Sequence, residues 1–242
     1  MNEVHKIAGP EHNFLMGFYY RLTNRPDEAI DRYKRCLNDR VVSNRSRREL
    51  VQVYISVNDY SSANTLARDN YEEYPLNPHH IQAYLNTLIN NGSNDFDVRR
   101  IEELIKSLES VGSDIANEMA AIAKAEYTAK CLDNYGKAKV LIEEAVSKYS
   151  DSHYPLLSKA FLAARYGDLN NLGAAYSKLK EIEKRKNVSS TSLAHLEASK
   201  TALEGDLIRA IKIAEKNLDR YPKLALEKIL NELTMLSEQK RI

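Results

Sequence analysis

The sequence predicts an all-α protein in which antiparallel helix pairs stack into a solenoid. Three observations predict it: a short segment recurs along most of the chain, each copy leads into an amphipathic helix, and glycine and proline are scarce. The 242 residues include 8 glycines and 6 prolines. This scarcity argues against many short strands joined by turns and against a disordered chain. A regularly recurring segment is typical of helical-repeat architectures.

The recurring segment consists of a turn pair, then an aromatic residue, leucine or proline, and then a helix. Its copies begin at Asn24, Asn58, Asp133, Gly167 and Gly205, with a more diverged copy at Val98. The longer intervals contain a turn-rich stretch at 90–97 and a second loop at 184–190. Each copy has a small or apolar residue early in its helix, and these residues lie 34 to 38 positions apart: Ala29, Ala63, Ile101, Ala138, Leu172 and Ala210.

Local signals support each expected helix. Within 29–37 the apolar side chains recur at the spacing of one helical face. Pro26 lies in a first turn, where its missing N–H costs nothing, and Pro75 and Pro222 end helices. Four side chains stand where an N-cap would satisfy the free amides of a second helix: Asp59, Asn134, Asp168 and Asp206.

The repeat resembles that of the tetratricopeptide family. In that pattern the first helix carries a bulky residue, Leu, Gly or Ala, and Tyr, and the second carries Ala, an aromatic residue and Ala, with Pro at its exit. The resemblance covers about six degenerate repeats over residues 10–222. The matching residues are Met16, Gly17, Tyr20, Ala29, Tyr33 and Cys36 in the first repeat, Leu50, Tyr54, Ala63, Ala67 and Pro75 in the second, Ile122, Ala129, Ala138, Ile142 and Ala145 in the fourth, and Ala194, Ala198, Ala210, Ala214 and Pro222 in the sixth.

The resemblance implies a right-handed superhelix forming a single domain over 1–242. Repeats are expected at approximately 10–43, 44–77, 78–115, 116–152, 153–188 and 189–222. Residues 223–240 are expected to form a capping helix that shields the end of the stack. Its apolar face would consist of Leu224, Leu226, Ile229, Leu230, Leu233 and Leu236.

Composition narrows the classes of partner. A net charge of +1, from 35 basic and 34 acidic residues, gives no overall field to attract nucleic acid or an anionic membrane. The apolar runs are far shorter than the roughly 20 residues needed to span a bilayer. Cys36 and Cys131 lie far apart, and the first residues lack the apolar core of a signal peptide. A cytoplasmic location is therefore expected.

Catalytic and metal-binding motifs are not found in the sequence. Phosphate-binding, dinucleotide-binding, nucleophile-elbow and zinc-protease patterns are missing, and neither cysteine has a companion at metal-ligand spacing. The stretch 90–97 is rich in Asn and Asp, but Ile101 stands where a calcium loop needs its bidentate glutamate. We therefore expect no cofactor and no enzymatic activity.

In the tetratricopeptide family, ligands usually lie along the concave face, which the first helices line. Aromatic, cationic and amide side chains on such a face suit an extended peptide. The alternative is an ordinary solvated helix face with a few packing aromatics. The expected groove residues are Phe14, Phe18, Arg21, Arg45, Arg48, Gln52, His79, Gln82, Asn86, Tyr127, Lys130, Tyr154, Phe161, Arg165, His195 and Ser199.

Three further features refine the expected groove. Family members that clamp a chaperone's terminal carboxylate carry Lys and Asn where this chain has Phe14 and Phe18, which argues against that clamp. Arg45 and Arg48 share a face and suit phosphate or an acidic motif, whereas the run 184–186 suits a helix end. Glu126 occupies a close-packing position, with Lys159 and Glu197 at the adjoining position of the next two repeats. A charge ladder through these three side chains is one hypothesis, and a solvated Glu126 is the other.

The expected function is a protein-interaction scaffold that binds a partner segment in its concave groove. The alternative is a sensor or oligomerisation arm of a larger signalling ATPase or nuclease, prompted by the short stretch before the first helix. That stretch also suggests self-association through the N-terminal end. Helical-repeat RNA binding is a third interpretation, and it predicts affinity that falls steeply with salt.

Overall fold

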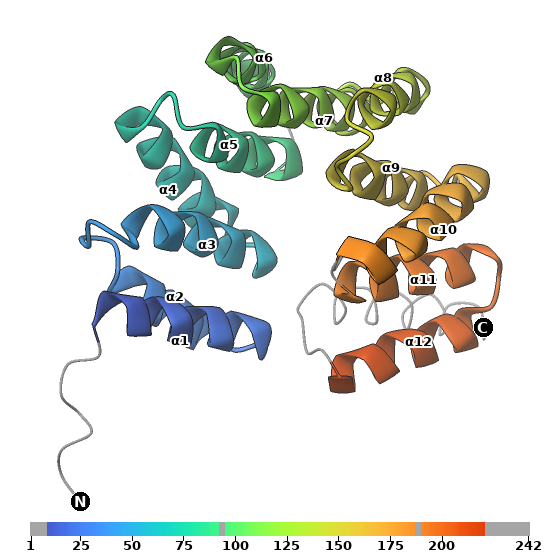
Figure 1. Cartoon of the computed structure of the whole chain (residues 1–242), viewed down its shortest axis with the longest axis horizontal. Helices are drawn as coiled ribbons and strands as arrows, with labels where there is room; N and C mark the ends of the chain where they lie inside the picture. Colours follow the sequence, from blue (N-terminus) through green and yellow to red (C-terminus); the bar gives the residue numbers. More distant parts are fainter. Residues whose placement is uncertain (1–8, 92–94, 187–189, 221–242) are drawn as a thin grey trace, which may run out of the picture. The chain divides into compact units, whose positions relative to one another are not determined.

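The computed structural model describes residues 9–91, 95–186 and 190–220, and within these ranges every regular element is a helix. The predicted all-α class is confirmed. Figure 1 shows helices following one another through short turns. The expected capping helix at 223–240 and the helix stop at Pro222 lie outside the described residues.

The chain divides into two compact units, 1–91 and 92–242, and each is described by itself. The division falls inside the expected third repeat, after its first helix. The single domain over 1–242 therefore stays a prediction.

The first unit stacks five helices. In it α1 pairs with α2 and α3 with α4, and α5 packs on α4. Because α3 also contacts both α1 and α5, these three helices form one row, visible in Figure 1. The helices are α1 (Pro10–Leu22), α2 (Pro26–Lys34), α3 (Ser43–Ser56), α4 (Tyr60–Glu73) and α5 (Pro78–Asn91).

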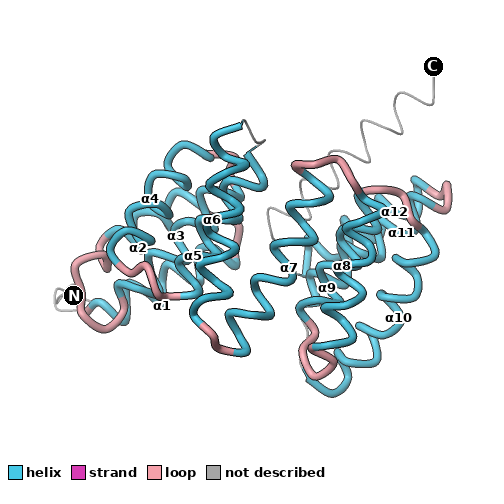
Figure 2. Tube along the Cα trace, turned by 90° about the horizontal axis from the view of Figure 1, so that it is seen from above, coloured by secondary structure: helices cyan, strands magenta, loops and turns pink. Residues whose placement is uncertain are grey.

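The second unit repeats this arrangement. Each helix packs on the next, and α9 contacts both α7 and α11, so these three again form a row. Figure 2 shows the helices in cyan, joined by short loops in pink. The helices are α6 (Asp95–Val111), α7 (Asp114–Lys130), α8 (Tyr135–Lys148), α9 (Tyr154–Arg165), α10 (Leu169–Lys186), α11 (Ser190–Leu203) and α12 (Leu207–Arg220).

The recurring turn pair has a structural cause. Its first residue adopts a positive φ of 47° to 95° in five copies, a conformation that Asn, Asp and Gly tolerate better than other residues. The following residue caps the second helix in four of these copies, as predicted. Each cap accepts a hydrogen bond from a backbone N–H: Asp59 from Ser62 (3.1 Å), Asn134 from Lys137 (2.9 Å), Asp168 from Asn171 (3.1 Å) and Asp206 from Arg209 (3.0 Å).

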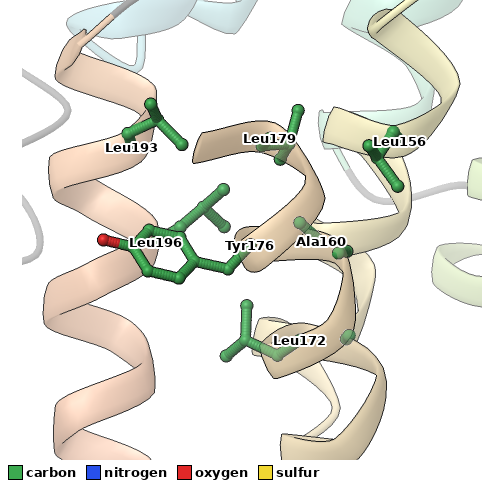
Figure 3. Close-up of a cluster of buried hydrophobic side chains, with 9 residues drawn as sticks. Leu156, Ala160, Leu172, Tyr176, Leu179, Leu193 and Leu196 are labelled. Atoms are coloured by element: carbon green, nitrogen blue, oxygen red, sulfur yellow. The ribbon is translucent and has the colours of Figure 1, made fainter. Parts of the chain in front are cut away.

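The small residues of the repeat allow close packing between helices. Ala29, Ala63, Ala138 and Ala210 are fully buried. A Cβ added at Gly17 would lie 2.8 Å from the Tyr33 ring, so α1 and α2 need glycine at this contact. Figure 3 shows the equivalent core around α10, where Tyr176 and Leu179 face Leu193 and Leu196 of α11.

Candidate peptide-binding surfaces

The structure brings five of the predicted groove residues into one pocket of the first unit. The pocket has a volume of about 210 Å³ and lies between α3 and α5. Positions four apart on α3, and three and four apart on α5, share a helical face, which is why these side chains converge. Its lining consists of Arg48, Glu49, Gln52, His79, Gln82, Ala83 and Asn86.

Hydrogen-bond donors dominate this α3–α5 pocket. Within the residues that the structure describes, the Arg48 guanidinium has no ion-pair partner. The one carboxylate, Glu49, is engaged by Arg21 Nε at 3.0 Å. Burial and then the charge of Arg48 lower the pKa of His79, so this imidazole is neutral at pH 7. The pocket is therefore suited to a ligand rich in acceptor oxygens.

The predicted groove residues of α1 do not line that pocket. Phe14 packs on Tyr33, with ring centroids 5.9 Å apart, and joins the core. The Arg21 guanidinium lies 5.1 Å from the centre of the partly exposed Phe18 ring. Arg45 is exposed one turn before Arg48 and stands outside the lining.

In the second unit the predicted groove residues mostly contact one another or their neighbours. Tyr127 is 5% exposed and donates its hydroxyl to Glu102 Oε1 of α6 at 3.1 Å. Lys130 Nζ pairs with Glu126 at 3.3 Å. Tyr127 is therefore a core residue that fixes α7 on α6, and its ring is not open to a ligand.

The remaining predicted residues follow α9 and α11. Phe161 and His195 meet edge to face with centroids 5.2 Å apart, and burial lowers the pKa of His195 to about 4. Tyr154 is exposed beside His153, and Arg165 is exposed at the end of α9. The rings of Phe161 and His195 thus pack against each other, whereas the side chains of Tyr154 and Arg165 are exposed.

The hypothesis of a charge ladder is wrong, because Glu126 and Lys159 have other partners. Glu126 accepts a hydrogen bond from Ser158 Oγ at 2.8 Å besides pairing with Lys130. Lys159 pairs with Glu143 of α8. Glu126 is therefore half-buried and satisfied without Lys159.

Sequence reasoning missed a groove between α8 and α10, because it considered only the first helices. This groove has a volume of about 1080 Å³ and is lined by Gly136, Lys139, Val140, Glu143, Glu144, Ser147, Lys148 and Asn171. An exposed Val140 on a second helix was the available signal. Its lining surface is mainly apolar, although four of its residues carry a charge: Lys139, Glu143, Glu144 and Lys148.

Membrane-spanning helices and metal-binding clusters are both absent from the described part of the chain. There, no helix combines the length and apolar character needed to cross a bilayer. Over the same residues, His, Cys, Asp and Glu form no group of three or more that could hold a metal ion.

Several solved structures have a similar fold. A thermophilic tetratricopeptide protein from Thermus thermophilus superposes with a TM-score of 0.59 over 79% of this chain and 98% of its own, at 12% identity. A tetratricopeptide repeat protein from Parabacteroides merdae gives 0.50 over 96% and 88%, at 13% identity. PilW, described as a widely conserved type IV pilus biogenesis factor, gives 0.50 over 91% and 98%, also at 13%.

No family model matches this sequence, and the search of curated proteins finds no match either. The structural likeness is at low identity and therefore concerns the fold. It confirms the tetratricopeptide-type architecture that the repeat predicts.

Proposed function

We propose that this chain is a non-enzymatic protein-binding scaffold, and that the α3–α5 pocket receives an extended partner segment carrying an acidic side chain. The single observation that carries the proposal is the convergence of Arg48, Gln52, His79, Gln82 and Asn86 in one pocket. The tetratricopeptide-type fold supports it, because stacked helix pairs expose long faces of this kind.

The chemistry of the lining favours a peptide. The Gln52, Gln82 and Asn86 amides each offer both a donor and an acceptor, which is what an extended backbone presents in turn. Neutral His79 adds one more donor or acceptor. Amides spaced along two neighbouring helices can thus pair with successive peptide groups, and binding needs no bond to be made or broken.

Arg48 gives the acidic preference. A guanidinium forms two parallel hydrogen bonds with a carboxylate, and such charge-assisted pairs are stronger than neutral ones. Glu49 does not compete for Arg48 at close range, since it is held by Arg21. An aspartate or glutamate of the partner is the natural counter-ion.

The test is selection from a displayed library of random peptides, followed by affinity measurement for the enriched sequences. We expect enriched peptides to share an acidic residue and to lose roughly tenfold or more in affinity against Arg48→Ala, as for a charge-assisted pair. Arg68→Ala is the matched control, because Arg68 is an exposed arginine of α4 in the same unit.

Equal binding by wild type and Arg48→Ala would refute the assignment. So would enriched peptides without acidic residues. Selection of basic peptides would place the site elsewhere, and tight binding of RNA with a steep salt dependence would replace the peptide by a nucleic acid.

A further inference from the structure

Two of the residues that line the α3–α5 pocket can bear a positive charge, Arg48 and His79. They come from neighbouring helices, Arg48 from the first half of α3 and His79 from the first turn of α5. Within the described residues, neither the Arg48 guanidinium nor the His79 imidazole makes a side-chain hydrogen bond. Both groups are therefore available to the same bound ligand.

Local contacts fix the position of His79. Helix α5 begins at Pro78, and the backbone N–H of His79 donates to Asn77 Oδ1 at 3.0 Å. The next residue, His80, is fully buried and stacks on Tyr74 with ring centroids 5.5 Å apart. Because successive residues of a helix point in different directions, burial of His80 leaves His79 exposed, where it lines the pocket.

In the free pocket the imidazole of His79 is uncharged at pH 7. Desolvation of the ring, and then the charge of Arg48, lower the pKa of His79 below its ordinary value of 6.5. The positive end of the α5 dipole acts in the same direction, because His79 lies in the first turn of this helix. The free pocket therefore presents one cation beside a neutral ring.

The other charged side chains near this imidazole are paired or lie outside the pocket lining. On α3, Glu49 pairs with Arg21 at 3.0 Å, and Arg45 is exposed outside the lining. On the neighbouring α4, Glu73 pairs with Arg47 of α3 at 3.0 Å. A carboxylate bound in the pocket would therefore bring a negative charge that no cation of the chain has already engaged.

We propose that His79 joins Arg48 in binding the acidic side chain of the partner, and that its imidazole takes up one proton from the solvent when that side chain binds. The proposal rests on the proposed function of the α3–α5 pocket. A carboxylate at Arg48 offsets the positive charge that opposes protonation of the ring. It also accepts a charge-assisted hydrogen bond from the imidazolium that forms. Binding of an acidic segment is therefore regulated by pH.

The direction of this pH dependence follows from the proton balance. Where the pH lies between the pKa values of His79 in the free protein and in the complex, the complex holds more protons, so affinity rises as the pH falls. Aspartate and glutamate of the partner titrate near pH 4 and stay ionised above about pH 5.5. Burial, with the charges of Arg48 and Arg47, lowers the pKa of His80 to about 4, so this neighbour stays neutral in the same range.

Isothermal titration calorimetry tests the proposal, with a selected acidic peptide that has blocked termini and no histidine. Wild type is expected to bind it roughly threefold to tenfold more tightly at pH 5.5 than at pH 7.5. At pH 6.5 the binding enthalpy should vary with the ionisation enthalpy of the buffer, which measures net proton uptake. His79→Gln keeps a side-chain donor but cannot titrate, so its affinity should be equal at the two pH values and its enthalpy independent of the buffer.

His12→Gln is the matched control, because His12 is an exposed histidine of α1 in the same unit and stands outside the pocket lining. It should keep the pH dependence of wild type, and circular dichroism at both pH values verifies that each protein is folded. A pH dependence that survives His79→Gln would overturn the inference. Binding that Arg48→Ala weakens but pH leaves unchanged would overturn this inference alone, whereas no binding of acidic peptides at either pH would overturn the proposed function with it.

Discussion

The first helices of the two units differ in whether the side chain at one equivalent repeat position is open to a ligand. Gln52 and Asn86 are one repeat apart in the first unit, and both line the α3–α5 pocket. Tyr127 and Phe161 are one repeat apart in the second unit. There Tyr127 is buried against α6 and Phe161 packs on His195. The same register thus yields an open surface in one unit and an occupied one in the other.

Side-chain size and polarity account for this difference. An amide on a short stem leaves space between neighbouring helices, and its polar end is best satisfied by water or a ligand. An aromatic ring fills the same space and gains by burying its surface. Repeat register therefore predicts which residues share a face, while residue type decides whether the chain itself uses that face.

The largest expected effect is the loss of stability in Tyr127→Ala. Because the ring is 5% exposed, its removal should lower the free energy of unfolding by about 3 kcal/mol, measured by urea denaturation. Tyr127→Phe keeps the ring but loses the hydrogen bond to Glu102, and should cost about 1 kcal/mol. If Tyr127→Ala were as stable as wild type, the second row would be an open surface after all.

The next effect concerns two histidines, the buried His80 of the first unit and the half-buried His195 of the second. Burial lowers the pKa of both His80 and His195 to about 4, and for His80 the charges of Arg48 and Arg47 add to it. The folded form therefore resists protonation while the unfolded chain, with a pKa near 6.5, accepts the proton. The folded state therefore has its full stability above about pH 6.5 and loses stability as the pH falls toward 4.

His80→Phe isolates the contribution of the first unit. Neither ring nitrogen of His80 has a hydrogen-bond partner among the described residues, so the change should alter stability at pH 7 by less than about 1 kcal/mol. The free energy of unfolding of the variant, relative to that of wild type, should be about 2 kcal/mol greater at pH 5 than at pH 7. Urea denaturation at the two pH values measures this difference. An unchanged difference would mean that His80 is protonated in the folded chain.

Sequence could predict the fold because its signals are local and repeated. Asp59, Asn134, Asp168 and Asp206 cap helices as predicted, since a cap depends on residues three apart in the chain. The burial of Tyr127 could not be predicted this way. It depends on Glu102, which lies 25 residues earlier on α6, and no short-range pattern contains that contact.

The repeat period also allowed part of the candidate site to be predicted from the sequence. A period of 34 residues places Arg48 and Gln82 on neighbouring helices, and the α3–α5 pocket contains both. Phe14 has the same register, but the adjacent Tyr33 ring is 5.9 Å away and draws it into the core. Register gives the face of each side chain, whereas its nearest neighbour determines whether it remains accessible.

A smaller effect is expected at Asp168, whose cap also links two repeats. Burial alone would raise the pKa of Asp168, but hydrogen bonds from Asn171, Lys139 and Tyr135 outweigh it and lower the pKa to about 2. Asp168→Ala should therefore cost about 1–2 kcal/mol at pH 7. The cost should shrink as the pH falls from about 4 toward 2, because the wild-type carboxylate is then protonated. Asp206→Ala, which removes a more exposed cap, is the comparison and should cost less.

The smallest expected effect is the one that most sharpens the contrast between the units. Gln52→Ala and Gln82→Ala should each change the free energy of unfolding by less than about 0.5 kcal/mol, as for surface side chains without structural partners. The same variants should weaken the selected peptides severalfold, since each removes an amide that faces the ligand. Side chains held for folding would give the opposite result, with clear destabilisation and unaltered peptide affinity. The α3–α5 pocket would then belong with Tyr127 and Phe161, as a face that the chain itself requires.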